Sequence, residues 1–446
     1  MPKGPKDFLA KQIRTTQLMG SGSFPSSVPD LMIYRSTNAP DYDGTIPLHI
    51  QDAIDNASAE DTLHIWAWTY YETIEIDEEL TVIGNGTGNT TINGTWSGVI
   101  VKITKSDVTL KNLRLVSGHN QTDSQLLSIE ANNAFIEGLL IEKGSRGILV
   151  AGNDAKIFNT TVRHLSENGM LLQSSSSNAI VYKSTFSHSN YGIYIGLGHH
   201  PAKIIDCSIH NNTNDGIRSE SYGSIIRDNI IVDNSGWGIG LHGQSTDDPD
   251  SIVTNNTLLQ NVLGGIFLYR QDANLYSNTI QDNNCGIYID HSVGIYLWNN
   301  TVTSNDEYDI KLTTSSDPNY AIGTTFSTIS VDSSSSLIIK SYIDLDVNDA
   351  SGDNMSGIDI KVMEDGVQKY ATSYFDGSDP KTDSSGTIAT FLINSKKYDG
   401  SSTAEIIPTF VSARYHDWVE TTSFDSSSTI QITVPDLRVQ NTRTGI

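Results

Sequence analysis

The sequence predicts an all-β protein organised around a solenoid of stacked, parallel strands. Three observations carry this prediction: a short motif repeats along residues 147–312, apolar residues alternate within its copies, and asparagines recur in two columns. Alternation of apolar and polar residues has the period of a strand rather than that of a helix. A motif that returns about every 23 residues is the signature of a repeat architecture.

The motif consists of a glycine, an apolar residue, any residue and a second, usually apolar residue. Its copies lie 21 to 27 residues apart and begin at Gly147, Gly169, Gly192, Gly216, Gly238, Gly265, Gly286 and Asp309. A second strand follows about twelve residues after each glycine, and no copy has room for a helix between its strands. Each copy is therefore expected to form one coil of a solenoid.

Two asparagine columns support this arrangement. One contains Asn229, Asn256, Asn278 and Asn300, and the other contains Asn212, Asn234, Asn261, Asn283 and Asn305. Asparagines one coil apart can stack at the strand spacing of ~4.8 Å and bond amide to amide. They also tolerate left-handed backbone, so we expect a turn at each column. The result is a parallel β-helix, in which a coil buries its apolar positions only when a neighbour stacks on it.

This repeat resembles the parallel β-helix repeat of the pectate-lyase-like superfamily, especially its copper-processing and carbohydrate-binding branch. The resemblance covers about residues 46–312 and implies that the β-helix is right-handed. It leaves function open, because that fold hosts lyases, hydrolases, adhesins and viral spikes.

The rest of the chain divides into an N-terminal segment (1–44), the β-helix (45–325), a Ser-rich linker (326–336), a β-sandwich (337–436) and a tail (437–446). Thr45 is the expected N-cap of a helix over residues 46–57, with the apolar stripe Ile50, Ala53, Ile54 and Ala57. This helix would cap the open end of the β-helix and protect its strand edges.

The two ends of the chain carry further resemblances. Residues 11–23 and 31–40 resemble the N-terminal attachment segment of tailed-virus tail fibres and spikes; the alternative is a leader followed by one strand. Residues 337–436 contain seven short alternating strands, which predict a small antiparallel β-sandwich. This part is similar to the Ig-like domains that follow β-helices in archaeal surface proteins.

Composition restricts the partners. The formal net charge of −24 repels nucleic acid, and no basic patch opposes it, so we expect no nucleic acid partner. The acidity can serve solubility alone, adaptation to a saline habitat or the binding of divalent cations.

No stretch is long and apolar enough for a membrane span, and the N-terminus lacks the apolar core of a secretion signal. Cys207 and Cys285 lie about three coils apart, too far for a disulfide, and are expected to be buried.

Candidate binding residues follow from the alternation of the strand after each glycine. Positions +1 and +3 should face inward, and positions +2 and +4 should face solvent. Candidate ligand-binding residues in these outward columns and the position beside them are Tyr194, Arg218, Phe267, Tyr288, His242, Tyr269, Arg270 and His291. Aromatic faces that stack on sugars, flanked by charged groups that hold hydroxyls, are typical of a glycan site.

Glu220 and Asp290 are the candidate catalytic pair on the same face. They should lie about 14 Å apart, whereas glycosidase carboxylates are about 5–9.5 Å apart. A lyase would instead need a base and a charge neutraliser, such as Arg270 with Tyr269. The remaining alternative is a solvated polar face with aromatic cross-strand pairs.

An acidic insertion is the candidate metal site. Asp247, Asp248 and Asp250 could supply oxygen ligands to Ca²⁺, although an ordinary solvated loop has the same composition. No other cofactor is expected. His164 and His188 should stack on adjacent coils without a third metal ligand nearby.

These observations favour a virion structural protein of tail-spike or fibre type, a rigid adhesin for host-surface glycans. The resemblance to tail spikes implies a homotrimer, with residues 1–44 contacting other virion proteins and a host glycan or protein as the ligand. The alternatives are a secreted or virion-borne polysaccharide-degrading enzyme and an archaeal cell-surface protein.

Overall fold

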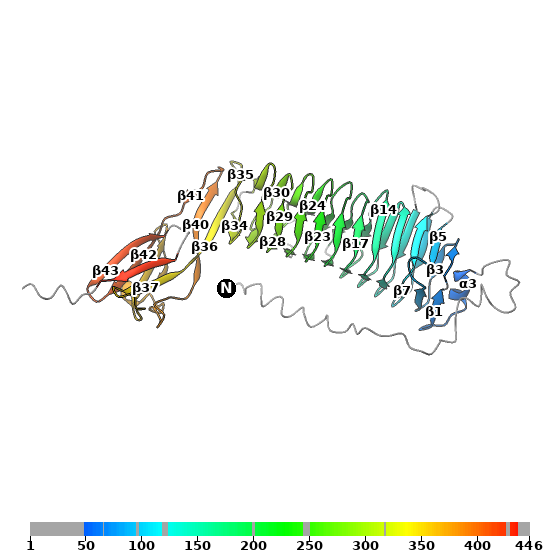
Figure 1. Cartoon of the computed structure of the whole chain (residues 1–446), viewed down its shortest axis with the longest axis horizontal. Helices are drawn as coiled ribbons and strands as arrows, with labels where there is room; N and C mark the ends of the chain where they lie inside the picture. The colour runs from blue at the N-terminus through cyan, green and yellow to red at the C-terminus, as the bar shows by residue number, and fades with distance from the viewer. Residues whose placement is uncertain are drawn as a thin grey trace, which may run out of the picture.

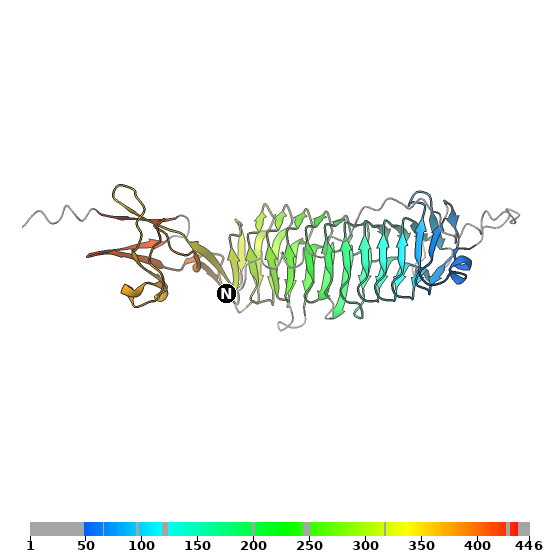
Figure 2. The same cartoon turned by 90° about the horizontal axis from the view of Figure 1, so that it is seen from below.

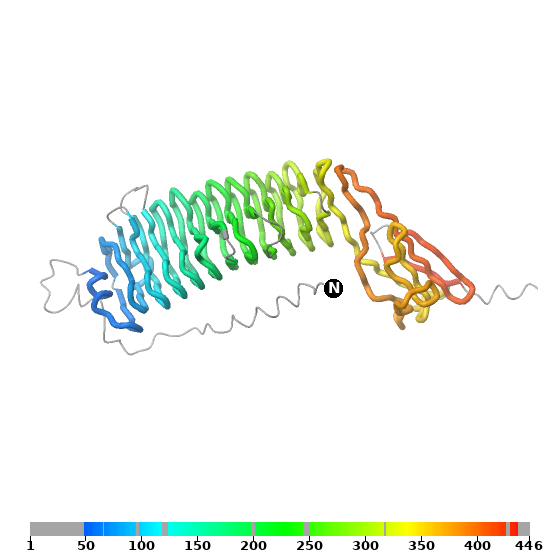
Figure 3. The backbone as a smooth tube through the Cα atoms, turned by 180° about the vertical axis from the view of Figure 1, so that it is seen from behind, coloured from blue at the N-terminus to red at the C-terminus, as the bar shows by residue number. Residues whose placement is uncertain are grey.

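The computed structural model describes residues 49–65, 67–94, 98–117, 124–198, 201–243, 250–315, 318–424 and 429–435. The chain forms a long parallel β-helix with helix α3 (Ile50–Asp55) at one end and a smaller β module at the other (Figure 1). The view from below shows the same elongated outline (Figure 2). The backbone tube shows the coils stacked along the long axis (Figure 3).

Three sheets run along the β-helix, and each coil contributes strands to them. Sheet A contains, in order, β1 (Thr62–Ile65), β4 (Thr81–Gly84), β7 (Thr109–Lys111), β10 (Phe135–Glu137), β13 (Lys156–Phe158), β16 (Ile180–Tyr182), β19 (Lys203–Ile205), β22 (Ile225–Arg227), β25 (Ser251–Thr254), β28 (Ala273–Tyr276), β31 (Tyr296–Trp298), β34 (Asn319–Ile322) and β36 (Ser336–Ile343). Sheet B contains β2 (Thr69–Tyr70), β5 (Thr91–Gly94), β8 (Arg114–Ser117), β11 (Leu140–Gly144), β14 (Thr161–Leu165), β17 (Thr185–Ser187), β20 (Ser208–His210), β23 (Ile230–Val232), β26 (Thr257–Leu259), β29 (Thr279–Gln281) and β32 (Thr301–Thr303). Sheet C contains β3 (Ile74–Ile76), β6 (Gly98–Ile103), β9 (Ser124–Ile129), β12 (Arg146–Val150), β15 (Met170–Leu172), β18 (Ile193–Gly198), β21 (Ile217–Ser221), β24 (Trp237–His242), β27 (Gly264–Tyr269), β30 (Cys285–Asp290), β33 (Tyr308–Thr313) and β35 (Ile329–Val331).

The repeated glycine lies where two coils approach most closely. A β-carbon on Gly216 would lie 2.8 Å from the carbonyl oxygen of Gly238, and one on Gly238 would lie 2.8 Å from that of Gly265. Such contacts leave no space for a side chain, which explains the glycine in the seven successive coils from Gly147 to Gly286. The residues one and three positions later, such as Ile239 and Leu241, are completely buried in one continuous core.

Both asparagine columns form the predicted amide ladders. Asn212 Nδ2 donates to Asn234 Oδ1 at 2.8 Å, and Asn234 Nδ2 donates to Asn261 Oδ1 at 2.9 Å. The second column repeats this pattern, as Asn256 Nδ2 donates to Asn278 Oδ1 at 3.0 Å. The left-handed backbone, however, lies one residue before each ladder asparagine, as at Asn255 (φ 54°). The ladder residue itself turns its amide inward, where it is 1 % exposed at Asn256.

The asparagine ladder that begins at Asn212 ends at the copy of the motif that lacks glycine. Asn305 Nδ2 has no further asparagine above it and donates to Asp309 Oδ1 at 2.9 Å. Asp309 Oδ2 accepts the backbone N–H groups of Ser327 and Thr328. Burial raises the pKa of Asp309, but these donors outweigh it and hold the pKa below its ordinary value. The Asp309 carboxylate therefore ends this asparagine ladder and remains ionised.

The capping helix is shorter than predicted and is capped differently. Ile50 and Ile54 are buried as expected, and Ala53 and Ala57 pack against the core. His49 occupies the N-cap position without a side-chain cap, and the predicted cap Thr45 lies outside the described residues. Glu72 supplies the cap from elsewhere in the chain, since its carboxylate accepts the N–H groups of Ile50 (2.8 Å) and Gln51 (3.2 Å).

The Ser-rich segment 326–336 is not a linker. It contains β35, which pairs in parallel with β33 and extends sheet C. The next strand, β36, pairs in parallel with β34 on one side and antiparallel with β40 (Phe391–Asp399) on the other. Serine side chains at turns bond to neighbouring polar groups, so a Ser-rich composition also fits a coil of the β-helix.

The C-terminal module only partly matches the predicted antiparallel sandwich. Its four-stranded sheet is antiparallel and has the order β39 (Val367–Ala371), β38 (Asp359–Glu364), β42 (Thr409–Tyr415), β43 (Trp418–Phe424). The remaining elements are β37 (Leu345–Asp349), the 3-10 helix η2 (Ser373–Phe375), β40, β41 (Glu405–Ile406) and β44 (Ile430–Val434). β37 and β44 pair in parallel, which the prediction of an antiparallel sandwich missed. The module has its own apolar core.

Two further predictions can be compared with the structure. Cys207 and Cys285 are buried free thiols, as expected. No helix within the described ranges is long and apolar enough to cross a membrane.

Candidate functional site

The outer face of sheet C from β18 to β33 carries the predicted candidate residues. Strand register places Tyr194, Arg218, Gly240, Phe267 and Tyr288 side by side as successive cross-strand neighbours. These are the +2 positions of five coils, and their outward orientation is the one that the alternation predicts.

A second row follows two residues further along each strand. His242 neighbours Tyr269, and Tyr269 neighbours Asp290. Glu220 holds the equivalent place on β21, two residues after Arg218. The register therefore brings the candidate residues of both columns onto one face.

Aromatic rings form the centre of this face. The ring of Phe267 stacks on Trp237 (centroids 5.1 Å apart, 20° between planes) and lies 5.1 Å from the ring of Tyr288. We call Trp237, Phe267 and Tyr288 the aromatic strip. Trp237 was missed in the sequence because it precedes the glycine motif rather than following it.

The signal that could have found Trp237 is a second glycine on the next coil. A β-carbon on Gly264 would lie 2.1 Å from the Trp237 ring, so the absence of a side chain there makes room for the indole.

Charged groups border the aromatic strip. The Arg270 guanidinium lies 5.2 Å from the centre of the Tyr269 ring, and Lys311 Nζ lies 5.0 Å from that of Tyr288. The His291 ring meets Tyr269 edge to face, with centroids 5.5 Å apart. The face thus combines apolar ring surfaces with hydrogen-bonding side chains, a combination common in ligand sites.

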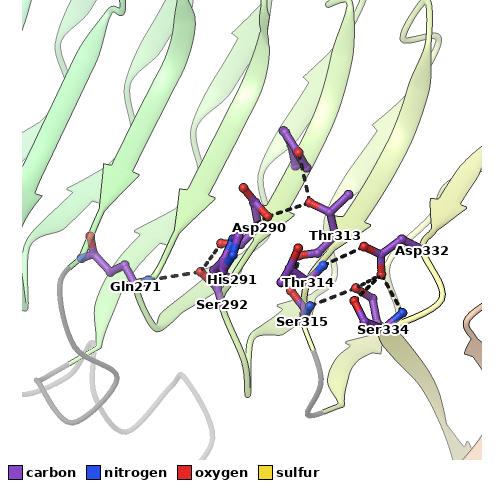
Figure 4. Close-up of polar contacts among 11 residues, drawn as sticks. Gln271, Asp290, His291, Ser292, Thr313, Thr314, Ser315, Asp332 and Ser334 are labelled. Atoms are coloured by element: carbon purple, nitrogen blue, oxygen red, sulfur yellow. Dashed lines mark hydrogen bonds and ion pairs between the residues drawn. The ribbon is translucent and has the colours of Figure 1, made fainter.

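Asp290 belongs to a local polar network at one end of the face (Figure 4). Its Oδ1 lies 2.8 Å from His291 Nδ1 and 2.8 Å from the Thr313 hydroxyl, which is also 3.0 Å from the Tyr288 hydroxyl. Nearby, the Ser292 hydroxyl accepts the Gln271 N–H, and Asp332 accepts the Thr314 N–H. These contacts with His291 and Thr313 fix the position of the Asp290 carboxylate.

Glu220 and Asp290 are not brought together. They lie on β21 and β30, with β24 and β27 between them, which corresponds to about 14 Å at the strand spacing. Glu220 Oε1 instead pairs with Arg218 Nη2 at 3.1 Å. The geometry of a two-carboxylate glycosidase therefore does not arise from this pair.

Asp215 is a buried carboxylate that the sequence columns overlooked. It precedes Gly216, is 3 % exposed, and accepts the Trp237 N–H through Oδ1 at 2.8 Å. Oδ2 lies 3.9 Å from Arg218 Nη1. Burial raises the pKa of Asp215 above its ordinary value, against the opposing effects of the Trp237 N–H and Arg218. A count of positions after each glycine could not detect it.

His242 points at the same place as Asp215. Burial, followed by the charge of Arg218, lowers the pKa of His242 to about 4, so its ring is neutral near pH 7. Its Nε2 is buried and has no hydrogen-bond partner. A β-carbon on Gly240 would lie 3.1 Å from both His242 Nε2 and Asp215 Oδ2. We call this space, bordered by Asp215, Arg218, Gly240, His242 and Phe267, the Gly240 notch.

The predicted calcium site is only partly within the described residues. Asp250 is exposed and accepts a hydrogen bond from Asn274 Nδ2 at 2.7 Å. Asp247 and Asp248 lie outside the described residues. Within the described part of the chain, no group of three or more His, Cys, Asp or Glu side chains could hold a metal ion. The rings of His164 and His188 lie side by side on adjacent coils, as predicted, with centroids 4.6 Å apart, but their planes are tilted by 39°.

The fold and this face define a parallel β-helix protein with an aromatic and polar flank. The family model of the right handed beta helix region matches residues 125–275 and 242–326, in agreement with the predicted handedness. No protein of curated function matches the sequence.

Comparison with solved structures finds similarity at low sequence identity. The Dettilon tailspike protein is 14% identical and has a TM-score of 0.51, with 86% of this chain and 78% of that chain covered. A PL6 alginate lyase complexed with a trisaccharide is 13% identical, with a TM-score of 0.47 and coverage of 65% and 81%. The A-module of the Azotobacter vinelandii mannuronan C-5 epimerase AlgE6 is 15% identical, with a TM-score of 0.41 and coverage of 65% and 84%.

Proposed function

We propose that the outer face of sheet C binds a polysaccharide, and that the protein is a rigid adhesin of tail-spike type. The observation that carries the proposal is the aromatic strip, whose stacked rings lie on adjacent coils of a stiff scaffold. Aromatic faces pack against the C–H surfaces of sugar rings, while nearby polar groups bond to hydroxyls. A strip that follows the axis of the β-helix suits an extended chain of sugars better than a single small molecule.

The proposed location is the virion, with attachment to a host surface. Support comes from the resemblance of residues 11–23 and 31–40 to attachment segments of tail fibres and spikes, and a tailspike shares the fold. In this proposal residues 1–44 contact other virion proteins. A host cell-surface location is the alternative.

The proposal includes a homotrimer. Apolar side chains on the outer face of sheet A, including Ile225, Ile252 and Tyr296, are partly exposed in the single chain and could pack against a second copy. Ca²⁺ binding near Asp250, together with Asp247 and Asp248, also remains a proposal. If a bound Ca²⁺ ion stabilises the binding face, its removal by a chelator should lower the affinity for the glycan.

Substitution in the aromatic strip tests the binding face. Phe267→Ala should weaken polysaccharide binding about tenfold, because it removes an aromatic surface on which sugar rings stack and leaves the buried core unchanged. The measurement is the dissociation constant for a panel of host-surface polysaccharides.

Tyr71→Ala is the matched control, because Tyr71 is an exposed aromatic residue directly after β2, away from both the strip and the outer face of sheet A. Equal losses in the two variants would contradict the proposed face.

Cleavage of the polysaccharide is the second candidate function. It has less support, because Glu220 and Asp290 have separate partners on distant coils. Incubation with acidic and neutral polysaccharides should release no new reducing ends or unsaturated products. Such products, abolished by Glu220→Gln and Asp290→Asn, would favour the enzyme over the adhesin.

A further inference from the structure

We propose that the Gly240 notch is the specificity subsite of the sheet C face, and that it takes a neutral, hydroxyl-bearing sugar unit rather than a carboxylate-bearing one. This inference rests on the proposed glycan binding and adds the class of sugar that is recognised. It is carried by four features of the notch: a missing side chain, an unpaired ring nitrogen beside a carboxylate, local charge and a movable rim.

Gly240 is the one residue without a side chain among the five +2 positions of this face. The cross-strand neighbours of Gly240 are Arg218 and Phe267, both large side chains. Two strand spacings, about 9.6 Å between strand axes, separate these neighbours, so the column lacks a side chain between them, and His242 and Asp215 reach into this gap from beside it. A sugar ring stacked on Phe267 would therefore have a substituent beside the gap.

Two polar atoms lie at the gap. His242 Nε2 is buried without a hydrogen bond, and Asp215 Oδ2 has a long ion pair with Arg218 Nη1 at 3.9 Å. Buried polar atoms are nearly always paired, because leaving one unpaired is unfavourable. Both atoms lie 3.1 Å from the position of a β-carbon on Gly240, so they converge on one small space.

A hydroxyl group fits this pair of atoms. It can donate one hydrogen bond and accept another, whichever ring nitrogen of His242 carries the proton. A methyl group would leave His242 Nε2 unpaired and would give Asp215 Oδ2 no hydrogen bond. The notch is therefore suited to distinguish a sugar with a hydroxyl at this position from one without it.

Local charge argues against a carboxylate in the same place. Asp215 borders the notch, and the one cation that borders it, Arg218, is already paired with the carboxylate of Glu220 at 3.1 Å. A sugar carboxylate would meet the Asp215 carboxylate in a partly desolvated space, where like charges repel strongly. The net charge of −24 acts in the same direction at long range.

The rim of the notch is built from side chains that can move. The side chains of Arg218 and Glu220 are 27% and 25% exposed, so both have space to rearrange. By contrast, Asp215 is held by the Trp237 N–H and the His242 ring meets Phe267 edge to face at 5.3 Å. The recognising atoms are thus fixed, while the covering ion pair can open.

Calorimetric titration of the full chain with linear hexasaccharides tests the inference. The probes are hexasaccharides of glucose, mannose and galactose, with a galacturonate hexasaccharide as the acidic counterpart. At least one neutral probe should bind at least tenfold more tightly than galacturonate. Gly240→Ala should then weaken binding of that probe by roughly 5- to 100-fold, because its β-carbon fills the notch.

Two further variants complete the experiment. Gly88→Ala is the matched control, because a β-carbon there would meet nothing within 4 Å. His242→Phe keeps a ring but removes Nε2, and should weaken the same probe even if Gly240→Ala does not fold.

The outcomes separate this inference from the proposed function. Tighter binding of galacturonate, or unchanged binding in the folded Gly240→Ala and His242→Phe variants, would overturn the subsite while leaving glycan binding intact. If no probe binds the unaltered chain, both the subsite and the proposed glycan binding fail.

Discussion

At the scale of the residue, His242 is a side chain whose burial destabilises the folded chain at the proposed binding face. Its ring is packed between Gly240 and Phe267 with a buried, unpaired nitrogen. Burial and the nearby Arg218 lower its pKa from 6.5 to about 4. The unfolded chain therefore binds more protons than the folded chain between these two values.

This difference predicts a pH dependence. The free energy of unfolding should fall as the pH drops from 6.5 towards 4, because His242 must gain a proton that the folded state disfavours, and this contribution should be complete below pH 4. His242→Gln should remove that part of the dependence. Urea unfolding midpoints at pH 7, 6, 5 and 4 measure it.

His64→Gln, a change on the outer face of β1, serves as the control for this measurement. Parallel pH curves for the unaltered chain and His242→Gln would show that His242 does not titrate as described.

The residues of the site also show what the sequence could reveal. Strand alternation placed Arg218, His242 and Phe267 on one face, because orientation along a strand depends only on local spacing. Asp215 and Trp237 escaped detection because both lie before the glycine, Asp215 in the connection before β21 and Trp237 at the start of β24. Their positions depend on contacts between coils, which no single copy of the repeat contains.

At the scale of the element, the amide ladders hold the turns of neighbouring coils in register. Asn283 donates to Asn305 Oδ1 (3.2 Å) and to the Leu258 carbonyl (3.1 Å), and its Oδ1 accepts both the N–H and Nδ2 of Asn261. Removing it would leave several buried donors and acceptors without partners.

Asn283→Ala should therefore lower the free energy of unfolding by about 2–4 kcal/mol, since each unpaired buried polar group costs about 1–3 kcal/mol and the site can partly relax. Thermal and urea unfolding followed by circular dichroism would measure the change.

The adjacent residue provides the control. Asn284 is exposed, and Asn284→Ala should change stability by less than about 0.5 kcal/mol. Similar losses in the two variants would show that the amide ladder contributes little.

Sequence periodicity predicted the coils but not the ends of the β-helix. The glycine and asparagine columns repeat, so their geometry follows from one copy and its neighbours. The helix cap depends on Glu72, which lies on another coil, and the last coils lack both signatures and are rich in serine. The parallel pairing of β37 with β44 joins strands about 85 residues apart, which alternation within each strand cannot predict.

At the scale of the whole molecule, the charge and the proposed homotrimer act against each other. Each chain carries a formal charge of −24, so three chains in contact repel one another. Salt screens exposed charges, with a Debye length of about 10 Å at 0.1 M and about 3 Å at 1 M.

Light scattering should therefore give a mass of about three times 48.6 kDa, with the trimer more populated as salt concentration rises. A mass near one chain at every salt concentration would exclude the trimer.

The amide ladders also give the rod an electrical direction. Backbone hydrogen bonds between coils run both ways along the axis, as Ile148 donates to Gly169 on the next coil whereas Gln173 donates back to Val150. The bonds between the side-chain amides, by contrast, all run from Asn212 towards Asn305, while the second Nδ2 hydrogen bonds back to a carbonyl of the preceding coil, as Asn283 does to Leu258. The aligned amides add as dipoles do in a helix, and the Asp309 carboxylate lies at their positive pole. The two ends of this rod are thus electrically distinct before any partner binds.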